Sequence, residues 1–592
     1  MLGAEVVVHV VEDMDDAEAF GAWVDEHKGA WVAVDTEATG LNVYATDWRL
    51  RSVQIGTKRE AWVLWVEGSY AGLRPVVQAA LLSLPKQLAH NRAYDAGALE
   101  VSGFRHRLWE GHDTLLMSHL VDTRGVKDGG VGHKLKDLGA FYVDPSMADS
   151  DVALKEWARS ENIPLDERFR RAPCRLPELE EYAGIDTMIT SALYEIFDGK
   201  LIEREHRLLE FEEALQRVCA DMGERGLLLD VPYAEALREH LLDREDILRQ
   251  KMDAHGIENP SAPAQIRYAL RDAGLTLLTP TGKLSVSKDA LEGVAHPVAQ
   301  LVQDFRHVSK FRGSYVERSL ELVDAAGRVH PSIRSLQART ARMAVSDPPL
   351  HQLPATDALI RRMYIADPGM AIVSADYNQV ELNVVAELAG ERNMLKAIME
   401  GVDLHTNTAN LTGLTRKVAK MVNFLIVYGG GVAELMTKAN ISKAEAVKAL
   451  AAFHRAFPGI RRYGNRLQER TGKGAKPLVN PAGLSMRLDK DRTYAAINYM
   501  VQSTARYVLA EAMLELAESK FSGGLLLPIH DEMLAQVPIV GAQESADEIG
   551  AIMSRSFGGI ELVAEGEVYG PSWGHGYISR GVIPIELERW FV

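Results

Sequence analysis

The sequence predicts a multidomain protein in which an α/β domain precedes a larger α+β domain. A chain of 592 residues is long enough for several cores. The first third alternates strand-like runs such as AWVAVD and SVQIG with helical stretches, the pattern of an α/β domain. Residues 199–255 carry apolar positions at helical spacing, and strands mix with long helices after residue 330. We therefore expect domains at 1–198 and 199–592.

Composition and charge narrow the class of protein. The 47% hydrophobic and 25% charged content is ordinary for a globular protein. No cationic leader and no apolar run of about 18 residues occurs, so we expect neither secretion nor a membrane span, and a cytoplasmic location in a bacterial or phage-infected cell. Two cysteines cannot form a disulfide framework. The net charge of −16 argues only weakly against nucleic acid, because a cationic groove can be local and cation sites add carboxylates.

The N-terminal third contains three acidic motifs. The strand-like AWVAVDTEATGL brings Asp35 and Glu37 to one face, because alternate residues of a strand share a face. Asp95 follows in AHNRAYDAGAL, and EYAGIDTM sets Tyr182 and Asp186 on one helix face. A lone D-x-E is usually surface charge, so a cation site depends on the three motifs acting together.

The segment LLLPIHDEMLAQV, residues 525–537, predicts an antiparallel hairpin with acids at its tip. We expect Asp531 and Glu532 to lie there close together. Like charges at about 4 Å repel by roughly 4 kcal/mol at an effective dielectric of about 20, so gathered carboxylates normally share a cation or a proton. A solvated acidic turn is the alternative for this segment taken alone.

A second acidic segment, AIVSADYNQVELNVVAELAG, predicts a strand that ends at Asp376 and a helix that follows it. Asp376 is either a metal-ready carboxylate at the strand end or the N-cap of the helix. The spacing of four predicts that Tyr377 and Glu381 share a helix face.

The segment TRKVAKMVNFLIVYGGG predicts a helix that begins near Thr415. Arg416, Lys420, Phe424 and Tyr428 recur at intervals of four and form one stripe. Cations near a helix N-terminus attract a triphosphate, and aromatic faces one and two turns on can pack on a base or sugar. The alternative is an amphipathic helix with snorkelling cations.

These three C-terminal segments resemble the motifs of family A DNA polymerases, the DNA polymerase I and Klenow-fragment type. Further matches from about residue 200 to 577 include FRHVSKFRGSYVERSL, TARMAVSDP, DLHTNTA, AAINYMVQSTA and GPSW. The resemblance implies a right-hand polymerase domain with a thumb at about 199–325, a palm at about 326–390 and 490–592, and fingers at about 391–489. It implies template-directed addition of dNTPs to a primer by two-metal phosphoryl transfer.

The resemblance also assigns roles to residues. Asp376, the Tyr377 carbonyl and Asp531 would bind two Mg²⁺ (or Mn²⁺) ions, with Glu532 beside them and Lys420 placed to protonate pyrophosphate. The incoming nucleotide would be held by Arg416, Lys420, Phe424, Tyr428, Glu381, Gln379 and His405, with Glu381 excluding a ribose 2′-hydroxyl. Primer–template contacts would come from Arg342, Asn498, Gln502, His530 and Lys310. Tyr494, Pro349 and His351 depart from the family pattern, which affects expected template contacts and not the metal site.

The N-terminal motifs are similar to those of DnaQ-like, RNase H-fold 3′–5′ exonucleases, over roughly residues 5–195. By this resemblance Asp35, Glu37, Asp95 and Asp186 would hold two metal ions, and Tyr182 with Glu37 would orient the attacking water. All four acids are present, so we expect an active proofreading site.

Two other functions compete with a proofreading DNA polymerase. A single-subunit RNA polymerase has a related palm, but Glu381 and the fused exonuclease argue against it. A non-catalytic DNA-binding scaffold predicts broken carboxylate sets, and here they are complete. There is no room for a 5′ nuclease domain before residue 5, which indicates a replicative enzyme of a phage or small replicon. We expect a monomer whose possible partners are a helicase and a single-strand binding protein.

Overall fold

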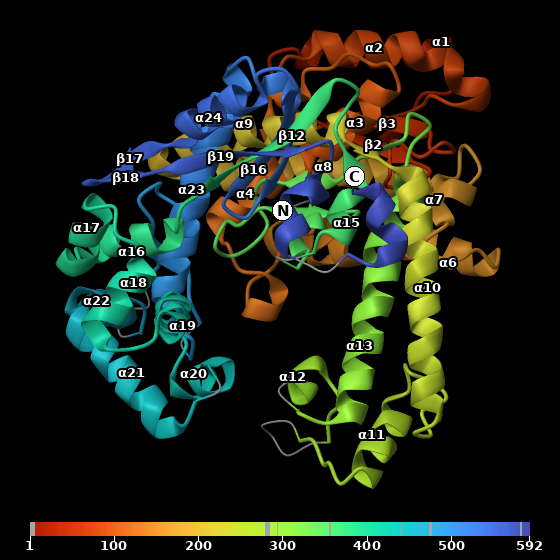
Figure 1. Ribbon diagram of the computed structural model, residues 1–592. Coiled ribbons are helices and arrows are strands. Elements are labelled where there is room, and N and C mark those ends of the chain that lie inside the picture. Colours follow the sequence, from red (N-terminus) through yellow and green to blue (C-terminus); the bar gives the residue numbers. More distant parts are fainter. Residues whose placement is uncertain are drawn as a thin grey trace.

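The computed structural model describes residues 6–278, 284–292, 294–354, 357–439, 441–472, 476–489, 491–580 and 583–591 (Figure 1). An N-terminal α/β domain and a larger α+β domain are both present, in the order that the sequence predicts. Within the described residues, no helix combines the length and the apolar character that a bilayer crossing requires.

The N-terminal domain is built on a six-stranded sheet of order β1-β4-β3-β2-β5-β6. Strand β2 pairs antiparallel with β3 and parallel with β5, so it lies in the interior of the sheet. Helix α8 (Pro177–Asp198) packs across β2, β3 and β4. The other elements are β1 (Val7–Val10), α1 (Met14–His27), β2 (Val32–Ala38), β3 (Leu50–Gly56), β4 (Glu60–Trp65), α2 (Arg74–Ser83), β5 (Gln87–Ala89), α3 (Arg92–Val101), β6 (His112–Asp113), α4 (Thr114–Val121), α5 (Leu135–Tyr142), α6 (Val152–Ser160) and α7 (Arg168–Arg171).

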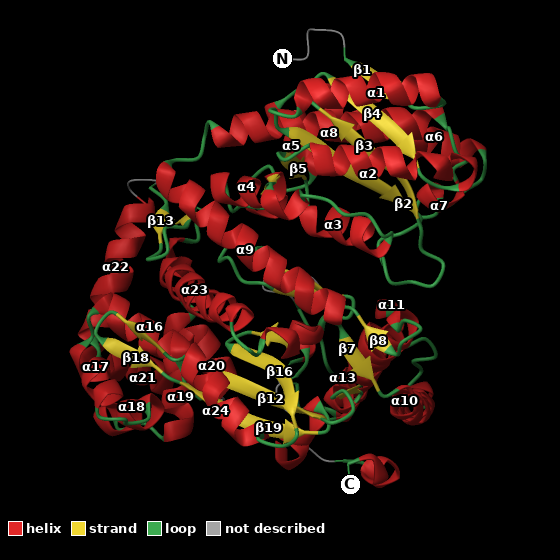
Figure 2. Ribbon diagram, turned by 90° about the horizontal axis from the view of Figure 1, so that it is seen from above, coloured by secondary structure: helices red, strands yellow, loops and turns green. Residues whose placement is uncertain are grey.

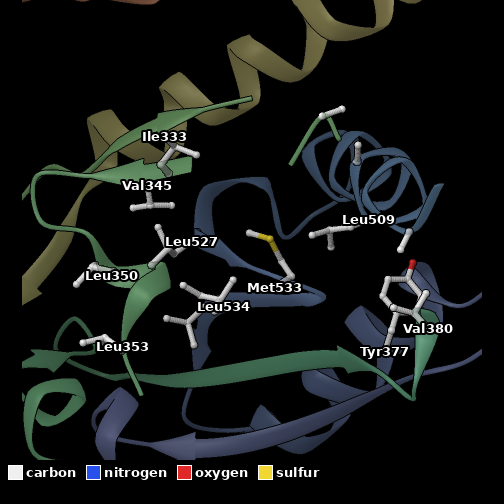
Figure 3. Packing of buried hydrophobic residues seen from close by; sticks show 14 of the residues in the cluster. Ile333, Val345, Leu350, Leu353, Tyr377, Val380, Leu509, Leu527, Met533 and Leu534 are labelled. Carbon is white, nitrogen blue, oxygen red and sulfur yellow. The ribbon is translucent and has the colours of Figure 1, made fainter. Parts of the chain in front are cut away.

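The centre of the larger domain is a four-stranded antiparallel sheet of order β15-β16-β12-β19. Its strands are β12 (Met370–Tyr377), β15 (Leu525–Ile529), β16 (Glu532–Pro538) and β19 (Ala564–Gly570). Helix α24 (Ala542–Met553) packs on β12 and β19, and Leu527, Met533 and Leu534 contribute to the apolar core of this palm (Figure 3). Strands β12, β15 and β16 are buried along almost their whole length, and the sequence shows them as continuous apolar runs.

Two helical groups extend from the palm (Figure 1). One is the long pair α10 (Val231–Asp253) and α13 (Pro297–Phe311), which pack side by side. The other is a compact group that contains α16 (Val380–Ala389), α17 (Arg392–Met399), α18 (Leu404–Thr412), α19 (Arg416–Val427), α20 (Val432–Ala439), α21 (Lys443–Ala456) and α22 (Pro458–Gly472). Remaining elements include α11 (Pro263–Asp272), α12 (Lys288–Leu291), β7 (Leu227–Leu229), β8 (Arg328–Val329), β9 (Ser332–Arg334), β10 (Ala344–Ser346) and α15 (Leu359–Arg362).

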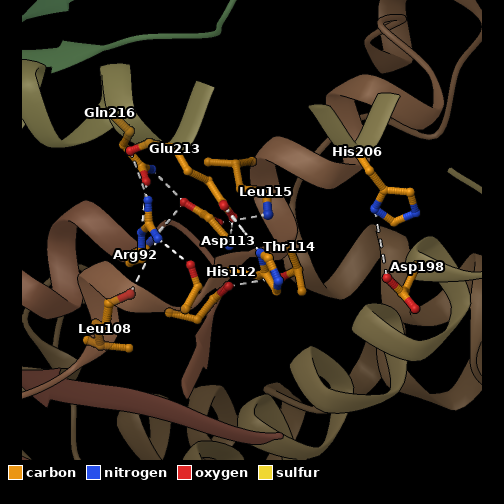
Figure 4. Close-up of polar contacts among 12 residues, drawn as sticks. Arg92, Leu108, His112, Asp113, Thr114, Leu115, Asp198, His206, Glu213 and Gln216 are labelled. Atoms are coloured by element: carbon orange, nitrogen blue, oxygen red, sulfur yellow. Dashed lines mark hydrogen bonds and ion pairs between the residues drawn. The ribbon is translucent and has the colours of Figure 1, made fainter. Parts of the chain in front are cut away.

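Helix α9 (Glu203–Arg225) lies between the two domains (Figure 2). It contacts α3 and α4 on one side, and α23 (Ala496–Glu518) and β15 on the other. At the first contact, Arg92 donates to the Gln216 side chain at 3.0 Å, and Gln216 donates to Asp113 at 2.5 Å (Figure 4). The projecting helical pair therefore begins at Val231, after α9 has joined the palm to the N-terminal domain.

The C-terminal residues return to the base of this helical pair. The rings of Tyr233 on α10 and Trp590 lie 5.6 Å apart, and Arg362 donates to the Trp590 carbonyl at 2.6 Å. Trp590, near the end of the described residues, thus packs where α10 leaves the palm.

Candidate active sites

The acidic hairpin and the acidic strand meet at one end of the palm sheet. β15 and β16 pair antiparallel, as the sequence predicts, and His530 and Asp531 form the turn, His530 in the left-handed region at φ 56°. In the neighbouring pairing, Asp376 stands opposite Glu532, and the Tyr377 amide donates to the Asp531 carbonyl at 3.3 Å. Asp376, on β12, and Asp531, in the turn before β16, therefore lie at the same end of the sheet.

The alternative reading of Asp376 as a helix cap is wrong. Helix α16 begins at Val380 and its N-cap residue is Gln379, with φ 52°. The left-handed turn at Gln379 separates strand from helix, so Asp376 stays on the strand and exposes its side chain at the end of the sheet.

The environment of Asp531 favours a bound cation. The pKa of Asp531 is raised to about 7, chiefly by burial and also by the neighbouring carboxylates of Glu381 and Asp376. The Arg342 guanidinium opposes this shift. A carboxylate that is both desolvated and surrounded by acids is stabilised in its ionised form by a divalent ion, and hard oxygen ligands suit Mg²⁺.

Glu532 does not lie at the hairpin tip, contrary to the sequence prediction. It is the first residue of β16 and is buried. Its carboxylate accepts from Ser374 at 2.6 Å and from Tyr569 at 3.3 Å. Successive strand residues face opposite sides, so Asp531 and Glu532 separate once pairing begins.

Tyr377 and Glu381 do not share a helix face, because Tyr377 belongs to the strand. The Tyr377 hydroxyl donates to the Met553 carbonyl, within the core. Glu381 instead accepts from Arg342 Nη2 at 2.6 Å, and its charge raises the pKa of Tyr428, for which burial is the larger cause.

The predicted primer–template contacts converge in part. Arg342, Gln502 and His530 line one small cavity of about 30 Å³ together with Glu381 and Asp531. Gln502 lies on α23, one turn after Asn498. His351, which was expected to affect only template contacts, lines the same cavity, and its ring centroid lies 6.2 Å from that of His530. Lys310 lies elsewhere, exposed near the end of α13.

The predicted stripe of cations and aromatic rings forms on α19. Thr415 caps the helix, as expected, and Arg416, Lys420, Phe424 and Tyr428 are all exposed. The opposite face is buried. Lys420 Nζ lies 5.9 Å from the centre of the Phe424 ring, and the Phe424 and Tyr428 rings stack at 6.5 Å. The stripe thus presents charge at its start and aromatic surface at its end.

Asp403 is a residue of this region that the sequence analysis missed. It caps α18 by accepting from Thr406, and it also accepts from Arg416 Nε at 3.2 Å and from Gln379 Nε2 at 3.1 Å. His405 follows it, hydrogen-bonded to Asn423 at 3.0 Å, with burial lowering its pKa. The acid before a helical stretch could have been recognised as an N-cap, but its contact with Arg416 depends on the packing of α18 on α19.

The four exonuclease acids lie in the interior of the N-terminal domain. Asp35 and Glu37 come from β2, Asp95 from the first turn of α3, and Asp186 from α8. Thr36 donates to Asp95 at 2.7 Å, linking β2 to α3. Tyr182 lies one turn before Asp186 on α8, as the spacing predicts.

These acids share one electrostatic environment. Burial raises the pKa of Asp35 to about 7, and burial together with the charge of Asp35 raises the pKa of Glu37 and Asp95 well above the usual range. Among the described residues, no three His, Cys, Asp or Glu side chains are grouped so that they could hold a metal ion as they stand. The donor chemistry, oxygen-rich, desolvated and mutually repelling, nevertheless fits divalent cations.

Lys136 is the second residue that the sequence analysis missed. Its ammonium forms an ion pair with Asp186 and lies 4.2 Å from the centre of the Tyr182 ring. Its charge lowers the pKa of Asp35 and of Glu37. Lys136 lies in GHKLKDLGAFYV, outside the three acidic motifs of the N-terminal third. Only the packing of α5 on α8 therefore shows that it lies beside these acids.

Comparison with known proteins defines the class. Residues 232–575 match DNA polymerase family A, and residues 8–202 match a 3′–5′ exonuclease family. The chain belongs to DNA polymerase family A and carries an exonuclease domain ahead of its polymerase domain. It is a DNA-directed DNA polymerase, and these two domains imply dependence on divalent metal ions and use of dNTPs.

The relatives are phage and bacterial polymerases. The DNA polymerase of Mycobacterium phage D29 is 34% identical over 97% of this chain and 98% of its own length. That of Mycobacterium phage L5 is 32% identical over 97% and 98%. Among solved structures, the POL domain of Pol1 from M. smegmatis, in complex with a DNA primer-template and dNTP, matches with a TM-score of 0.75 and 21% identity, covering 96% of this chain and 100% of that one.

Proposed function

We propose that the Asp376 and Asp531 carboxylates and the Tyr377 carbonyl are the metal ligands of the polymerase site. The observation that carries this proposal is the strand pairing that brings Asp376 and the 530–531 turn to one end of the sheet. When bound, divalent ions lower the pKa of a primer 3′-hydroxyl and stabilise charge on leaving pyrophosphate. Glu532, bonded to Ser374 and Tyr569, would hold the first residues of β16 in place beneath the turn.

We propose that the exposed stripe of α19 binds the incoming nucleotide. Arg416 and Lys420 would grip the phosphates, with Lys420 donating a proton to pyrophosphate, and Phe424 and Tyr428 would pack on the base and sugar. The exposure of all four side chains on one face supports this assignment. His405 would add a further phosphate contact, and Gln379 would fix Asp403 beside Arg416.

We propose that Arg342, Gln502, Asn498 and His530 contact the primer–template beside this site. Their support is the cavity that three of them share with Asp531 and Glu381. Arg342 and Gln502 would read the minor groove, where correct base pairs present similar acceptors. Lys310 would contact the DNA backbone from the thumb.

We propose that Asp35, Glu37, Asp95 and Asp186 hold the metal ions of an active editing site. Tyr182, with Glu37, would orient the attacking water. The shared burial and the raised pKa values of the acids support this proposal. We also propose two Mg²⁺ ions in each site and a monomeric enzyme.

We also propose a role in phage DNA replication, with a helicase and a single-strand binding protein as partners. The two mycobacteriophage polymerases, which match over nearly their whole length, support this role.

Primer extension tests the polymerase assignment. Asp376→Ala and Asp531→Ala should each reduce dNTP incorporation on a labelled primer–template by at least about 10³-fold, because a ligand of the catalytic ion is lost. Trimming of single-stranded DNA should persist in both variants and serves as the control for folding. Extension at more than a tenth of the normal rate by either variant would show the palm assignment to be wrong.

The reciprocal experiment tests the editing site. Asp35→Ala should abolish trimming of a 3′-mismatched primer while leaving extension of a matched primer unchanged. The measurement is degradation without dNTPs and extension with them, on the same substrate. Unchanged trimming would remove the assignment of the four acids.

A further inference from the structure

Lys136 occupies a position that the proposed editing chemistry does not yet use. Its ammonium pairs with Asp186 and lies over the Tyr182 ring at 4.2 Å. These two residues lie one turn apart on α8, so a single cation from α5 contacts both. One of them is a proposed metal ligand and the other is proposed to orient water.

The close packing of α5 on α8 places the Lys136 side chain within contact distance of residues on α8. A Cβ at Gly139 would lie 2.8 Å from Ile189 Cγ2 on α8 and 3.3 Å from Met147 Cβ. A side chain at position 139 would press on Ile189, so glycine there lets the start of α5, which carries Lys136, pack closely against the face of α8 that carries Tyr182 and Asp186. The Lys136 side chain is only 21% exposed.

A purely structural role does not account for this position well. A lysine that is mostly removed from water loses hydration, and a lone ion pair rarely offsets that loss. Here the ammonium faces Asp186 directly and adds attraction to Asp35 and Glu37. It also interacts with Asp151, but Asp186, Asp35 and Glu37 are three of the four proposed metal ligands, as expected of a group that orients metal ligands.

We propose that Lys136 is a positioning residue of the exonuclease reaction. It clamps the Asp186 carboxylate and the Tyr182 ring in one arrangement, so that the metal ligand and the water-orienting hydroxyl keep a fixed separation along α8. This inference rests on the proposed editing function of the four acids. It adds a residue that acts through Asp186 and Tyr182 and does not itself touch the reacting atoms.

Single-turnover trimming of labelled single-stranded DNA by the full-length chain tests the inference. At saturating Mg²⁺, Lys136→Met should trim about 10- to 100-fold more slowly, the range for lost partners of metal ligands, with DNA affinity unchanged. Lys136→Arg should recover most of the rate, since it restores a cation of similar reach. Lys134→Ala, at an exposed residue on the same segment, is the matched control and should trim normally.

A second readout does not depend on activity. Thermal unfolding of Lys136→Met should occur at a lower temperature than that of the wild type in EDTA, and the difference should shrink in Mg²⁺. The reason is that either the Lys136 ammonium or Mg²⁺ can offset the repulsion between the clustered carboxylates. If Lys136→Met does not fold, Lys136→Gln takes its place, because glutamine keeps most of the length and a hydrogen-bond donor. Its trimming rate and unfolding temperature are then compared with the values expected for Lys136→Met.

Two results would overturn the inference. Trimming by Lys136→Met at the wild-type rate in saturating Mg²⁺ would mean that the ammonium only fills the place of an ion. Equal losses of trimming and of thermal stability in the Met and Arg variants, in both EDTA and Mg²⁺, would indicate packing alone. A different result would show that the editing proposal itself is wrong: in that case Asp35→Ala would trim DNA as fast as the wild type.

Discussion

Glu381 has a buried carboxylate near Tyr428, the last residue of the exposed stripe of α19. The residue is 7% exposed and accepts from Arg342 at 2.6 Å, and its charge adds to the effect of burial in raising the pKa of Tyr428. The carboxylate thus has a fixed position between a proposed DNA contact and a proposed nucleotide contact. A fixed side chain can reject an added hydroxyl by steric overlap more effectively than a mobile one.

We expect Glu381→Ala to incorporate ribonucleotides more readily. Removal of the side chain opens space beside the sugar, and a gain of about 10- to 100-fold in the rNTP-to-dNTP ratio corresponds to roughly 1.4–2.8 kcal/mol. Extension with dNTPs should also slow, because Arg342 loses its partner. Steady-state incorporation of rCTP and dCTP measures the ratio, and Glu400→Ala, at an exposed position, is the control. An unchanged ratio would contradict the role of Glu381 as a gate.

At the scale of residues, the sequence could identify acids in strand and helix motifs but not their partners. Asp376 and Asp531 were predictable because each follows an apolar strand. Glu532 was misplaced because the first ladder pair of β16 forms immediately after Asp531 and turns its side chain toward Ser374. Lys136 and Asp403 could not be found, since their contacts join helices through packing that no local pattern encodes.

Helix α23 links the primer–template residues to a buried ionic network. One turn after Gln502, Arg506 donates to both carboxylate oxygens of Glu212 on α9, at 2.5 and 2.6 Å, and to the Ser335 carbonyl at 2.6 Å. Tyr507 donates to the same carboxylate at 2.5 Å. Glu212 is fully buried, so the orientation of α23 depends on a charge pair without access to water.

We expect Glu212→Ala to destabilise the polymerase domain by about 3–5 kcal/mol, because it leaves a buried guanidinium unpaired. Urea unfolding followed by tryptophan fluorescence measures the change. Glu212→Leu combined with Arg506→Met should recover most of the loss, since an apolar pair needs no charge compensation. A loss below about 1 kcal/mol in the single variant would mean that water reaches the pair.

At the scale of elements, periodicity predicted the long helices and the palm hairpin, and the structure confirms both. α19 begins after Thr415 and the hairpin pairs as expected. The helix after Asp376 was predicted too early, because the left-handed turn at Gln379 delays its start to Val380. Such a conformation is uncommon for a residue other than glycine, so the sequence pattern gave no sign of it.

At the scale of the whole molecule, α9 joins the two domains through buried polar contacts. Asp113 accepts from the amides of Asn91 and Arg92 at the start of α3, the helix that carries Asp95. Gln216 on α9 donates to the same carboxylate. A residue outside the exonuclease domain therefore supports the helix that holds one of its acids.

We expect Gln216→Ala to slow trimming by about three- to tenfold while extension stays normal, since contacts of this kind carry about 0.5–2 kcal/mol of coupling. Trimming of single-stranded DNA and extension of a matched primer measure the two effects. Glu210→Ala, exposed on the same helix, should change neither. Equal trimming by Gln216→Ala and the wild type would show that α3 keeps its place without α9.

The buried junction along α9 also constrains how an error could be corrected. Opening a hinge there would break the hydrogen bonds that Arg92 and Asp113 make to Gln216, at a cost for each buried group. The proposed polymerase and editing sites then keep a fixed position relative to each other. The DNA must therefore move between them: a mispaired primer end separates from its template and reaches the editing site. The stability of the terminal base pairs would then decide how often a nucleotide is removed.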